Sequence, residues 1–394
     1  FNAGPEFFFP PDPTDTSASI GGMTACNASG AQSLFYGPTR RYVERLRVIL
    51  ADADRLELRR GQARAEGRRF TLRTRNGRTL SGRLPGYDMP AVKNAAGYHV
   101  RDDMDLVDLF VGSEGTLGIV SELDIRLIPA PSARWGVASF FPGETAALRF
   151  AVAVGAADPP PAAMEFFDSN SLNLLREQKA NNPAFGELPD IPAEWNTAVY
   201  VEYHGPEEES VESAVMQMSE IMIANGGDEA ATWLASDRNE MERLKDFRHA
   251  IPEAVNLKID EKRKSQPKLT KLGTDLAVPD EALEEVMAMY HRDLAAAGLN
   301  YVIFGHLGNN HVHVNIIPDT LKDYDRGKEL YLDWARAAAG MGGTVSAEHG
   351  IGKLKTDFLR RMYGGAAIAE MRALKAVFDP DWLLNPGNLF GIET

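Results

Sequence analysis

The sequence predicts an α+β fold in which antiparallel strands carry the core, and three observations support this. Strand-like and helix-like stretches alternate through the second half of the chain, which is typical of α+β domains. Asn76-Gly77 and the turn at 307–310 each separate two strand-like runs, as in β-hairpins. The 394 residues are 44% hydrophobic and 25% charged, which is the composition of a globular protein of about two or three domains.

The first half divides into glycine-rich turns and short strands. Residues 1–37 are rich in Gly, Pro, Ser and Asn, and we expect tight turns at Gly21-Gly22 and Gly30. Apolar patterns then predict strands at 43–50, 70–74, 79–80, 106–111 and 119–127. Pro129 and Pro131 mark a predicted boundary between a first domain at 1–131 and a second domain at 132–394.

The second half alternates between longer elements. The predicted strands are 136–141, 197–204, 272–278, 301–306 and 311–317. The predicted helices are 143–157, 207–225, 280–297 with Pro279 at its start, and three amphipathic closing segments at 323–339, 353–363 and 366–378. We expect the last helices and residues 385–390 to return to the first domain.

Charge and composition exclude several classes of protein. The net charge of −14 argues against nucleic-acid binding, and no apolar run approaches the roughly 18 residues of a membrane span. The lone Cys26 cannot form an internal disulfide, so we expect a cytoplasmic protein, with the periphery of an inner membrane as an alternative. Residues 40–83 hold 14 Arg and no Lys. They predict either an ion-paired surface or a docking surface for an acidic partner or an anionic membrane.

The strongest chemical signal is a pair of histidines on the predicted final hairpin. His306 ends one strand, and His313 lies on the next. Alternate residues of a strand share a face, so His311, His313 and Asn315 should point one way, away from the apolar core. Two imidazoles held on a rigid hairpin are good ligands for a divalent metal. The alternative is that these are hydrogen-bonded core histidines, but the clustering favours a metal site.

A second group, Thr344–Lys353, contains Glu348-His349 between glycines. Glu348 could supply a third, carboxylate ligand and leave an open position for substrate. Neighbouring side chains diverge, so His349 is better interpreted as a general base than as a fourth ligand. Two histidines and one carboxylate suit zinc, manganese or iron equally well.

Other signals are weaker or absent. Arg248 could grip a carboxylate, although a lone Arg is more often part of a surface ion pair. Lys271 and Asn315 are candidate residues of a substrate pocket, and Lys271 and Asp275 are unspecific taken alone. The glycines at 112–118 lead into a strand pattern, which is not the dinucleotide-binding fingerprint, and the sequence has no phosphate-binding P-loop motif and no nucleophile elbow.

Several strings resemble the FAD-linked oxidase/D-2-hydroxyacid dehydrogenase family, whose members include D-lactate dehydrogenases, the glycolate oxidase D subunit and D-2-hydroxyglutarate dehydrogenases. They are Pro11-Asp12-Pro13, Ile20-Gly21-Gly22, Asn27–Gly30, Tyr36-Gly37, Gly112–Val120, the histidine groups, Arg248 and Asn385–Asn388. The resemblance implies part of a flavin domain of the vanillyl-alcohol oxidase/p-cresol methylhydroxylase type, followed by an α+β substrate domain with an antiparallel sheet.

The resemblance also implies roles. His306, His313 and Glu348 match metal ligands, His349 matches the base for the 2-hydroxyl proton, Arg248 matches the holder of the substrate carboxylate, and Asn315 matches a pocket residue. The residues expected to line the FAD are Pro11, Asp12, Gly21, Gly22, Asn27, Ala28, Gly30, Tyr36, Gly112, Ser113, Glu114, Thr116, Gly118, Ile119, Val120 and Asn385. The implied activity is oxidation of a D-2-hydroxy acid by hydride transfer to flavin N5.

The resemblance also defines expected partners and departures. Electrons would leave to a quinone, a cytochrome or an electron-transfer flavoprotein. The family's N-terminal FAD subdomain is expected before residue 1, so a partner chain could supply it. A flavin-free subunit or fragment, and a metal-dependent lyase or hydrolase, are the alternatives. Asn309 replaces a common Asp and Ala53 replaces a common Gly.

Overall fold

The computed structural model describes residues 6–13 and 17–391 and divides the chain into two compact units. The first unit comprises the residues up to Pro129, Asp275–Pro279 and the residues from Ala335 onward. The second unit comprises Ala130–Thr274 and Asp280–Trp334. The chain therefore passes between the units several times. Among the described residues, no helix combines the length and the hydropathy that a membrane crossing needs.

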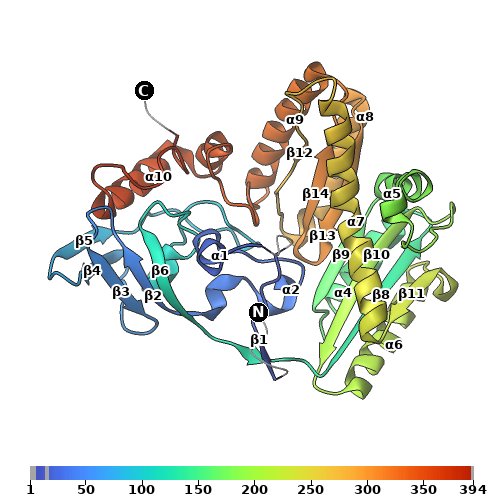
Figure 1. The fold of residues 1–394 in the computed structure, drawn as a ribbon, viewed down its shortest axis with the longest axis horizontal. Helices are drawn as coiled ribbons and strands as arrows, with labels where there is room; N and C mark the ends of the chain where they lie inside the picture. The colour runs from blue at the N-terminus through green and yellow to red at the C-terminus, as the bar shows by residue number, and fades with distance from the viewer. Residues whose placement is uncertain (1–5, 14–16, 392–394) are drawn as a thin grey trace. The chain divides into compact units, whose positions relative to one another are not determined.

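The second unit is built on a seven-stranded antiparallel sheet in the order β11-β8-β10-β9-β13-β14-β12 (Figure 1). Its strands are β8 (Ala133–Phe141), β9 (Ala163–Phe167), β10 (Thr197–Gly205), β11 (Thr232–Ala235), β12 (Leu272–Gly273), β13 (Tyr301–His306) and β14 (His311–Ile316). Its helices are α4 (Glu144–Gly155), α5 (Ser169–Asn181), α6 (Glu208–Ala224), α7 (Arg238–Arg263) and α8 (Leu283–Ala297), and α9 (Leu321–Gly340) begins in it.

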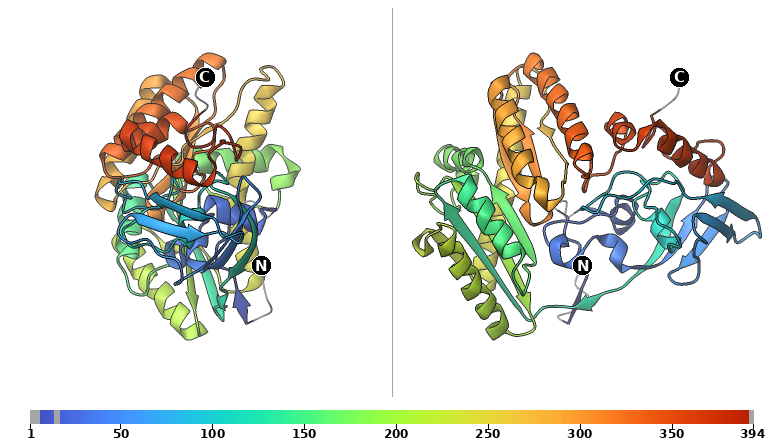
Figure 2. Two further views of the ribbon diagram at one scale, coloured as in Figure 1. Left: turned by 90° about the vertical axis from the view of Figure 1, so that its left-hand side faces the viewer. Right: turned by 180° about the vertical axis from the view of Figure 1, so that it is seen from behind.

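Helices cover both faces of this sheet, because the central strands carry apolar residues on both faces. Phe140 of β8 and Phe167 of β9 face α7 and contact Phe247. Phe141, which points the opposite way, packs on Phe150 of α4. Thus α5 and α7 lie on one face and α4 and α6 on the other (Figures 1 and 2). The face under α7 is the one that carries the polar residues described below.

The first unit contains three small antiparallel sheets. Their orders are β3-β2-β6, β4-β5 and β1-β7. The strands are β1 (Phe7–Phe8), β2 (Val43–Ile49), β3 (Arg55–Arg59), β4 (Arg69–Arg73), β5 (Thr79–Arg83), β6 (Ile119–Ile125) and β7 (Ile128–Pro129). The helices are α1 (Ile20–Cys26), α2 (Ser33–Tyr36), α3 (Val107–Phe110) and α10 (Thr356–Phe378). Phe378 of α10 stacks on Phe70 of β4, so the chain's last long helix packs on its early strands.

Many of the arginines at 40–83 form ion pairs within the first unit. Arg45 donates two hydrogen bonds of 2.9 Å to Asp124, and Arg60 donates to both oxygens of Asp108. These contacts connect β2 to β6 and the β3 end to α3. Docking of an acidic partner or an anionic membrane on this surface stays a prediction.

Most predicted elements form, but three predictions about local structure are wrong. Residues 106–111 contain the helix α3 rather than a strand. A short run whose one polar residue is Asp108 carries too little period to separate the two, and the Asp105 carboxylate accepts the Val107 amide. Gly21-Gly22 lies inside α1, where the Ser19 hydroxyl caps the Gly22 amide. The strand predicted at 272–278 ends at Gly273, where the chain leaves for the first unit.

Two long helices, α5 and α7, were not predicted. Helix α7 has 26 residues and contains Pro252, which cannot donate to the carbonyl four residues earlier and so disfavours a helix in sequence reasoning. The helix forms because Asp237 and Glu240 make a capping box and its apolar face packs on the sheet. The predicted break between 363 and 366 is confirmed, since Gly364 in α10 has a non-helical φ of 79°.

The aromatic contacts of α7 generate a stability prediction. Phe247 is fully buried, and its ring centroid lies 5.1 Å from that of Phe167 and 5.3 Å from that of Trp233. We expect Phe247→Ala to lower the free energy of unfolding by about 3–5 kcal/mol, because a large cavity opens between the helix and the sheet. Leu257→Ala, on the same helix but 39% exposed, is the control and should change it by less than about 1 kcal/mol. Equal losses in urea unfolding would contradict this assignment of the core.

Candidate functional site

The β13–β14 hairpin places three histidines on one face of the large sheet. His306 is the register partner of His311, and Phe304 is the partner of His313. Phe304 packs with the core under α7, so His306, two residues further on, faces the same side. His311 and Asn315 share this face with His313, as the strand alternation predicts. The turn between the strands closes with Asn310 in the left-handed region, at a φ of 49°.

The imidazoles lie close enough to share one ion. His306, His311 and His313 each offer a ring nitrogen within 4.8 Å of the others. The ring centroids of His311 and His313 are 4.4 Å apart, and His311 is 0% exposed. Sequence reasoning placed His311 on this face but did not nominate it as a ligand. The signal that could have identified His311 as a ligand is its spacing of two residues from His313.

Two hydrogen bonds fix which nitrogen of each ring carries the proton. Nδ1 of His306 lies 2.7 Å from Oε1 of Glu165 on β9, and Nδ1 of His313 lies 2.7 Å from the carbonyl oxygen of Thr274. A carbonyl or a carboxylate can only accept, so Nδ1 is the donor in each ring. The lone pair of each neutral ring is then at Nε2. This arrangement, an acceptor behind each imidazole, is typical of metal-binding histidines. Sequence reasoning did not identify Glu165.

Arg248 projects from α7 onto the same face of the sheet. Its guanidinium carbon lies 5.2 Å from the centroid of the Tyr200 ring, and the Tyr200 hydroxyl donates to Glu202 at 2.9 Å. Tyr200 is the register partner of Glu165, so the arginine and the histidine group belong to neighbouring positions on this face. Arg248 is thus part of a buried polar cluster and not of a surface ion pair.

Electrostatics in this cluster favour a charged Glu202. Burial alone would raise the pKa of Glu202, but the hydrogen bond from His204 at 2.6 Å and the charges of His204 and Arg248 outweigh it, and the pKa lies below its usual value. Burial raises the pKa of the neighbouring Tyr200 well above its usual value, so its hydroxyl stays protonated. The face therefore presents both a cation and a neutral hydrogen-bond donor.

The two candidate pocket residues lie at the edge of the same sheet. Asn315 is buried on β14 and is the register partner of Gly273 on β12. A side chain at 273 would approach the Asn315 amide oxygen at 3.1 Å, so glycine keeps this side of Asn315 open. Lys271 immediately precedes β12, and burial lowers the pKa of its ammonium group.

Glu348 and His349 belong to the first unit, in the loop between α9 and α10. Oε1 of Glu348 accepts the Ser29 hydroxyl at 2.6 Å and the Gly30 amide at 3.1 Å, and it forms an ion pair with Lys93. The His349 ring is 60% exposed, and its Nδ1 lies 3.6 Å from Oδ2 of Asp275. The predicted ligand and the predicted base are therefore neighbours in the chain. The Glu348 carboxylate is engaged by several donors, whereas most of the His349 ring is exposed.

The segments predicted to line a flavin converge within the first unit. The Gly112 amide donates to the Thr24 carbonyl, and the Glu114 amide donates to the Ala25 carbonyl. Asn385 donates its side-chain amide to the Glu114 carbonyl at 2.6 Å. Gly112 and Gly115 have φ values of 82° and 67°, which glycine adopts without strain, so the turn can pass close to α1.

Other predicted flavin residues also lie here, and some are committed to packing. Asp12 bridges to Gly30, where a side chain would overlap the Asp12 carbonyl. The Thr116 hydroxyl is bonded to the Tyr98 hydroxyl at 2.7 Å, and the Tyr36 ring packs edge-on against Phe8. The remaining predicted residues stand on α1 (Gly21, Gly22), just after it (Asn27, Ala28), or in the 113–120 stretch leading into β6 (Ser113, Gly118, Ile119, Val120).

A buried arginine sets the electrostatics near the 112–118 turn. Arg40 donates to the carbonyls of Asp108 and Val111, and burial lowers its pKa to about 10. Burial and the nearby Arg40 charge lower the pKa of His99 to about 3. His99 is therefore neutral in the folded protein throughout the physiological range.

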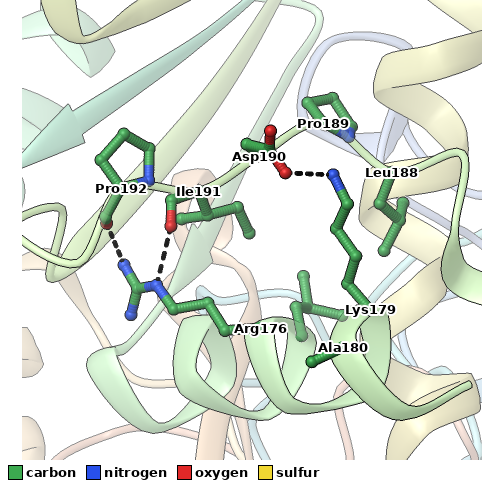
Figure 3. Close-up of a pocket in the computed structure, with 9 residues that line it drawn as sticks. Arg176, Lys179, Ala180, Leu188, Pro189, Asp190, Ile191 and Pro192 are labelled. Carbon is green, nitrogen blue, oxygen red and sulfur yellow. Dashed lines mark hydrogen bonds and ion pairs between the residues drawn. The ribbon is translucent and has the colours of Figure 1, made fainter.

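One cavity of about 390 Å³ lies elsewhere in the second unit, between α5 and residues 188–192 (Figure 3). Arg176 donates to the backbone carbonyls of Ile191 and Pro192, and Lys179 pairs with Asp190. Both cations on its wall are thus engaged by the protein itself. We do not place the substrate there.

Two family models match parts of this chain. The family described as FAD linked oxidases, C-terminal domain, matches residues 130–389, and the FAD binding domain matches residues 3–59. A probable mitochondrial D-lactate dehydrogenase from Danio rerio is 32% identical over 97% of this chain and 67% of its own length. Glycolate oxidase subunit GlcD of Bacillus subtilis is 29% identical over 97% of this chain and 70% of its own length.

Solved structures show the same fold at low sequence identity. The 4-ethylphenol oxidase from Gulosibacter chungangensis has a TM-score of 0.62 at 15% identity, covering 98% of this chain and 72% of its own. An alkyldihydroxyacetonephosphate synthase has a TM-score of 0.54 at 16% identity, and this chain spans only 58% of its length. These likenesses confirm the predicted flavin-domain type and mixed helix and antiparallel-sheet architecture.

The neutral His99 generates a pH prediction. Since its folded pKa is depressed to about 3, its contribution to stability is complete above its ordinary value of 6.5 and is lost as the pH falls below that value. Each pH unit below 6.5 should lower the free energy of unfolding by about 1.4 kcal/mol, or roughly 2 kcal/mol at pH 5. His99→Gln should remove this dependence in urea unfolding between pH 7 and pH 5.

His291→Gln is the control for this experiment. A hydrogen bond with Glu144 raises the pKa of His291, so its stabilisation is present at low pH and fades as the pH rises. The two variants should therefore differ from the parent with opposite pH trends. Identical trends would refute the neutral, buried state of His99.

Proposed function

The chain belongs to the family of FAD-linked oxidases, and on that premise we propose that it oxidises a D-2-hydroxy acid to the 2-oxo acid. The names of the relatives, D-lactate dehydrogenase, glycolate oxidase and D-2-hydroxyglutarate dehydrogenase, support this substrate class. One observation carries the proposal. Two imidazoles with acceptor-bonded Nδ1 atoms stand on the sheet face that also carries the half-buried Arg248.

The donor set fits a divalent metal. Nε2 of His306 and Nε2 of His313 carry the lone pairs, and His311 adds a third imidazole in the same group. Glu348 is the proposed carboxylate ligand, as the family resemblance implies. The contacts with Ser29, Gly30 and Lys93 all fall on its Oε1. Imidazole nitrogens together with a carboxylate suit zinc, manganese and iron.

Arg248 is proposed to bind the substrate carboxylate. A guanidinium grips a carboxylate through two parallel hydrogen bonds, and such bonds are strongest where water is excluded. The Tyr200 ring beneath the guanidinium restricts its orientation. Asn315, on the same face as His313, and Lys271, near β12, are proposed to line the rest of the pocket.

His349 is proposed to take the proton of the 2-hydroxyl group. Its exposed ring can reach a substrate that its buried neighbours cannot approach. When bound, a flavin would supply the hydride acceptor for C2, and a divalent cation would supply Lewis acidity at the 2-oxygen. The proton moves to His349 as C2 becomes a carbonyl carbon, so that charge and atoms balance. We further propose that the electrons leave to a quinone, a cytochrome or an electron-transfer flavoprotein. A peripheral membrane location and a partner chain belong to the same proposal.

The test is anaerobic stopped-flow spectroscopy of the flavin-loaded protein mixed with D-lactate, D-2-hydroxyglutarate and glycolate. We expect at least one acid to bleach the flavin absorbance. His349→Ala should slow that bleaching by about 10²–10⁴-fold, the usual contribution of a general base. Leu354→Ala, in the same loop and 95% exposed, is the control and should bleach at the parent rate. Bleaching by none of the acids would refute the substrate class, and full speed in His349→Ala would refute the base.

A second prediction tests the metal. Glu165→Gln should weaken binding of the metal by about 10–100-fold, because the charged acceptor behind His306 becomes a neutral amide, which can also present its NH₂ group to Nδ1. Glu144→Gln is a matched control, since Glu144 pairs with His291 at 2.8 Å in the same unit but outside the histidine group. Titration with Zn²⁺ and Mn²⁺ by calorimetry gives the affinities. Equal affinities in the two variants would contradict the proposed ligand orientation.

A further inference from the structure

Asp275 is a buried carboxylate that is surrounded by donors from one loop. It is 1% exposed. Its Oδ1 accepts the Glu348 amide at 3.1 Å, and its Oδ2 accepts the His349 amide at 3.0 Å. The Ser346 hydroxyl donates to Oδ2 at 2.5 Å, and the Lys355 ammonium donates at 2.7 Å. Every one of these donors lies within ten residues of the others, in the segment that carries the predicted ligand and base.

The other end of the loop has a similar anchor. The Glu114 carboxylate accepts the Ile351 amide at 2.6 Å and the Gly352 amide at 2.8 Å. Between the anchors, Gly350 has a φ of 68°, and its carbonyl oxygen lies 2.7 Å from the Ser346 hydroxyl oxygen. Two buried carboxylates thus hold four consecutive or nearly consecutive backbone amides. The stretch from Glu348 to Gly352 cannot shift without breaking charge-assisted hydrogen bonds.

We propose that Asp275 is a positioning residue that fixes the backbone of Glu348 and His349, and so presents the ligand and the base together. The inference rests on the proposed function for its chemical consequence. It does not require Asp275 to touch the substrate or the metal. Asp275 acts through two main-chain amides, and these determine where the two side chains begin.

Only an ionised carboxylate meets the requirements of this position. Both oxygens accept, and the ammonium group of Lys355 neutralises the charge. An amide in place of the carboxylate turns its NH₂ group toward at least one of these donors, and it leaves Lys355 without its anion. Asp275→Asn therefore keeps the shape of the side chain but removes its negative charge and one of its two acceptor oxygens. It should move the loop while leaving the rest of the first unit folded.

The first measurement is amide hydrogen exchange over residues 344–352 in the full chain. We expect Asp275→Asn to speed exchange at Glu348 and His349 on the order of tenfold or more, because their acceptor is lost. The matched control is Asp54→Asn. Asp54 is 6% exposed, lies in the same unit and also accepts two backbone amides, those of Arg55 and Asn76. Its substitution should leave exchange in 344–352 unchanged.

The second measurement separates kcat from KM in the flavin-loaded protein. Asp275→Asn should lower kcat by about 100-fold, the usual effect of displacing a reacting group by about 1 Å. KM should change by less than about threefold, because Arg248 is the proposed carboxylate holder and its contacts are untouched. Ser346→Ala keeps the Asp275 carboxylate and removes one of its donors, so it should change both exchange and kcat in the same direction but less.

The outcomes distinguish this inference from the proposed function. Parent-like exchange and kcat in Asp275→Asn, or in Ser346→Ala if the first variant does not fold, would overturn the positioning role even when the parent protein is fully active. Conversely, a parent protein that no D-2-hydroxy acid reduces would refute the proposed function. Amide hydrogen exchange over residues 344–352 would then still show whether Asp275 holds this loop.

Discussion

A carboxylate taken out of water must be surrounded by donors, and this constraint orders the chemistry-bearing parts of the chain. Glu165 faces the His306 ring, Glu202 faces His204 and Tyr200, and Asp275 and Glu114 face backbone amides. In each case the charge is stabilised only while its donors keep their places. The donors are therefore held as firmly as the acids. The side chains of the candidate site, such as His306 and His349, are among these donors or lie on the backbone that donates.

The same constraint explains why the histidine group belongs to a sheet. Neighbouring strands at fixed spacing set the distance between Glu165 and the hairpin, and Thr274 provides a carbonyl because β12 ends beside β14. A flexible loop could bring imidazoles together, but it could not also fix both tautomers. Arg248 reaches the same face because α7 packs across it along its apolar side.

Sequence reasoning could find the parts of the site that local patterns encode. His306 and His313 were predicted to be neighbours because a two-residue period and a tight turn dictate it. Glu165, Asp275 and the involvement of His311 were not predicted, because they depend on the register of strands and loops far apart in the chain. The helix at 107–110 was mistaken for a strand because a short run with Asp108 as its one polar residue shows no clear period. Helix α7 was overlooked because a proline in the middle of a segment, here Pro252, disfavours a helix.

The two units are interleaved along the chain, and this has a consequence for synthesis on the ribosome. The early strands pack on α10, and the 112–118 turn is held by residues 351, 352 and 385. Such contacts join residues separated by more than 200 positions, so closing them is slow and entropically expensive. The middle of the chain has its full sheet once β14 emerges. The segment at 43–118 must wait, with part of its apolar surface uncovered, until α10 and Asn385 are translated, and at this stage it is exposed to aggregation.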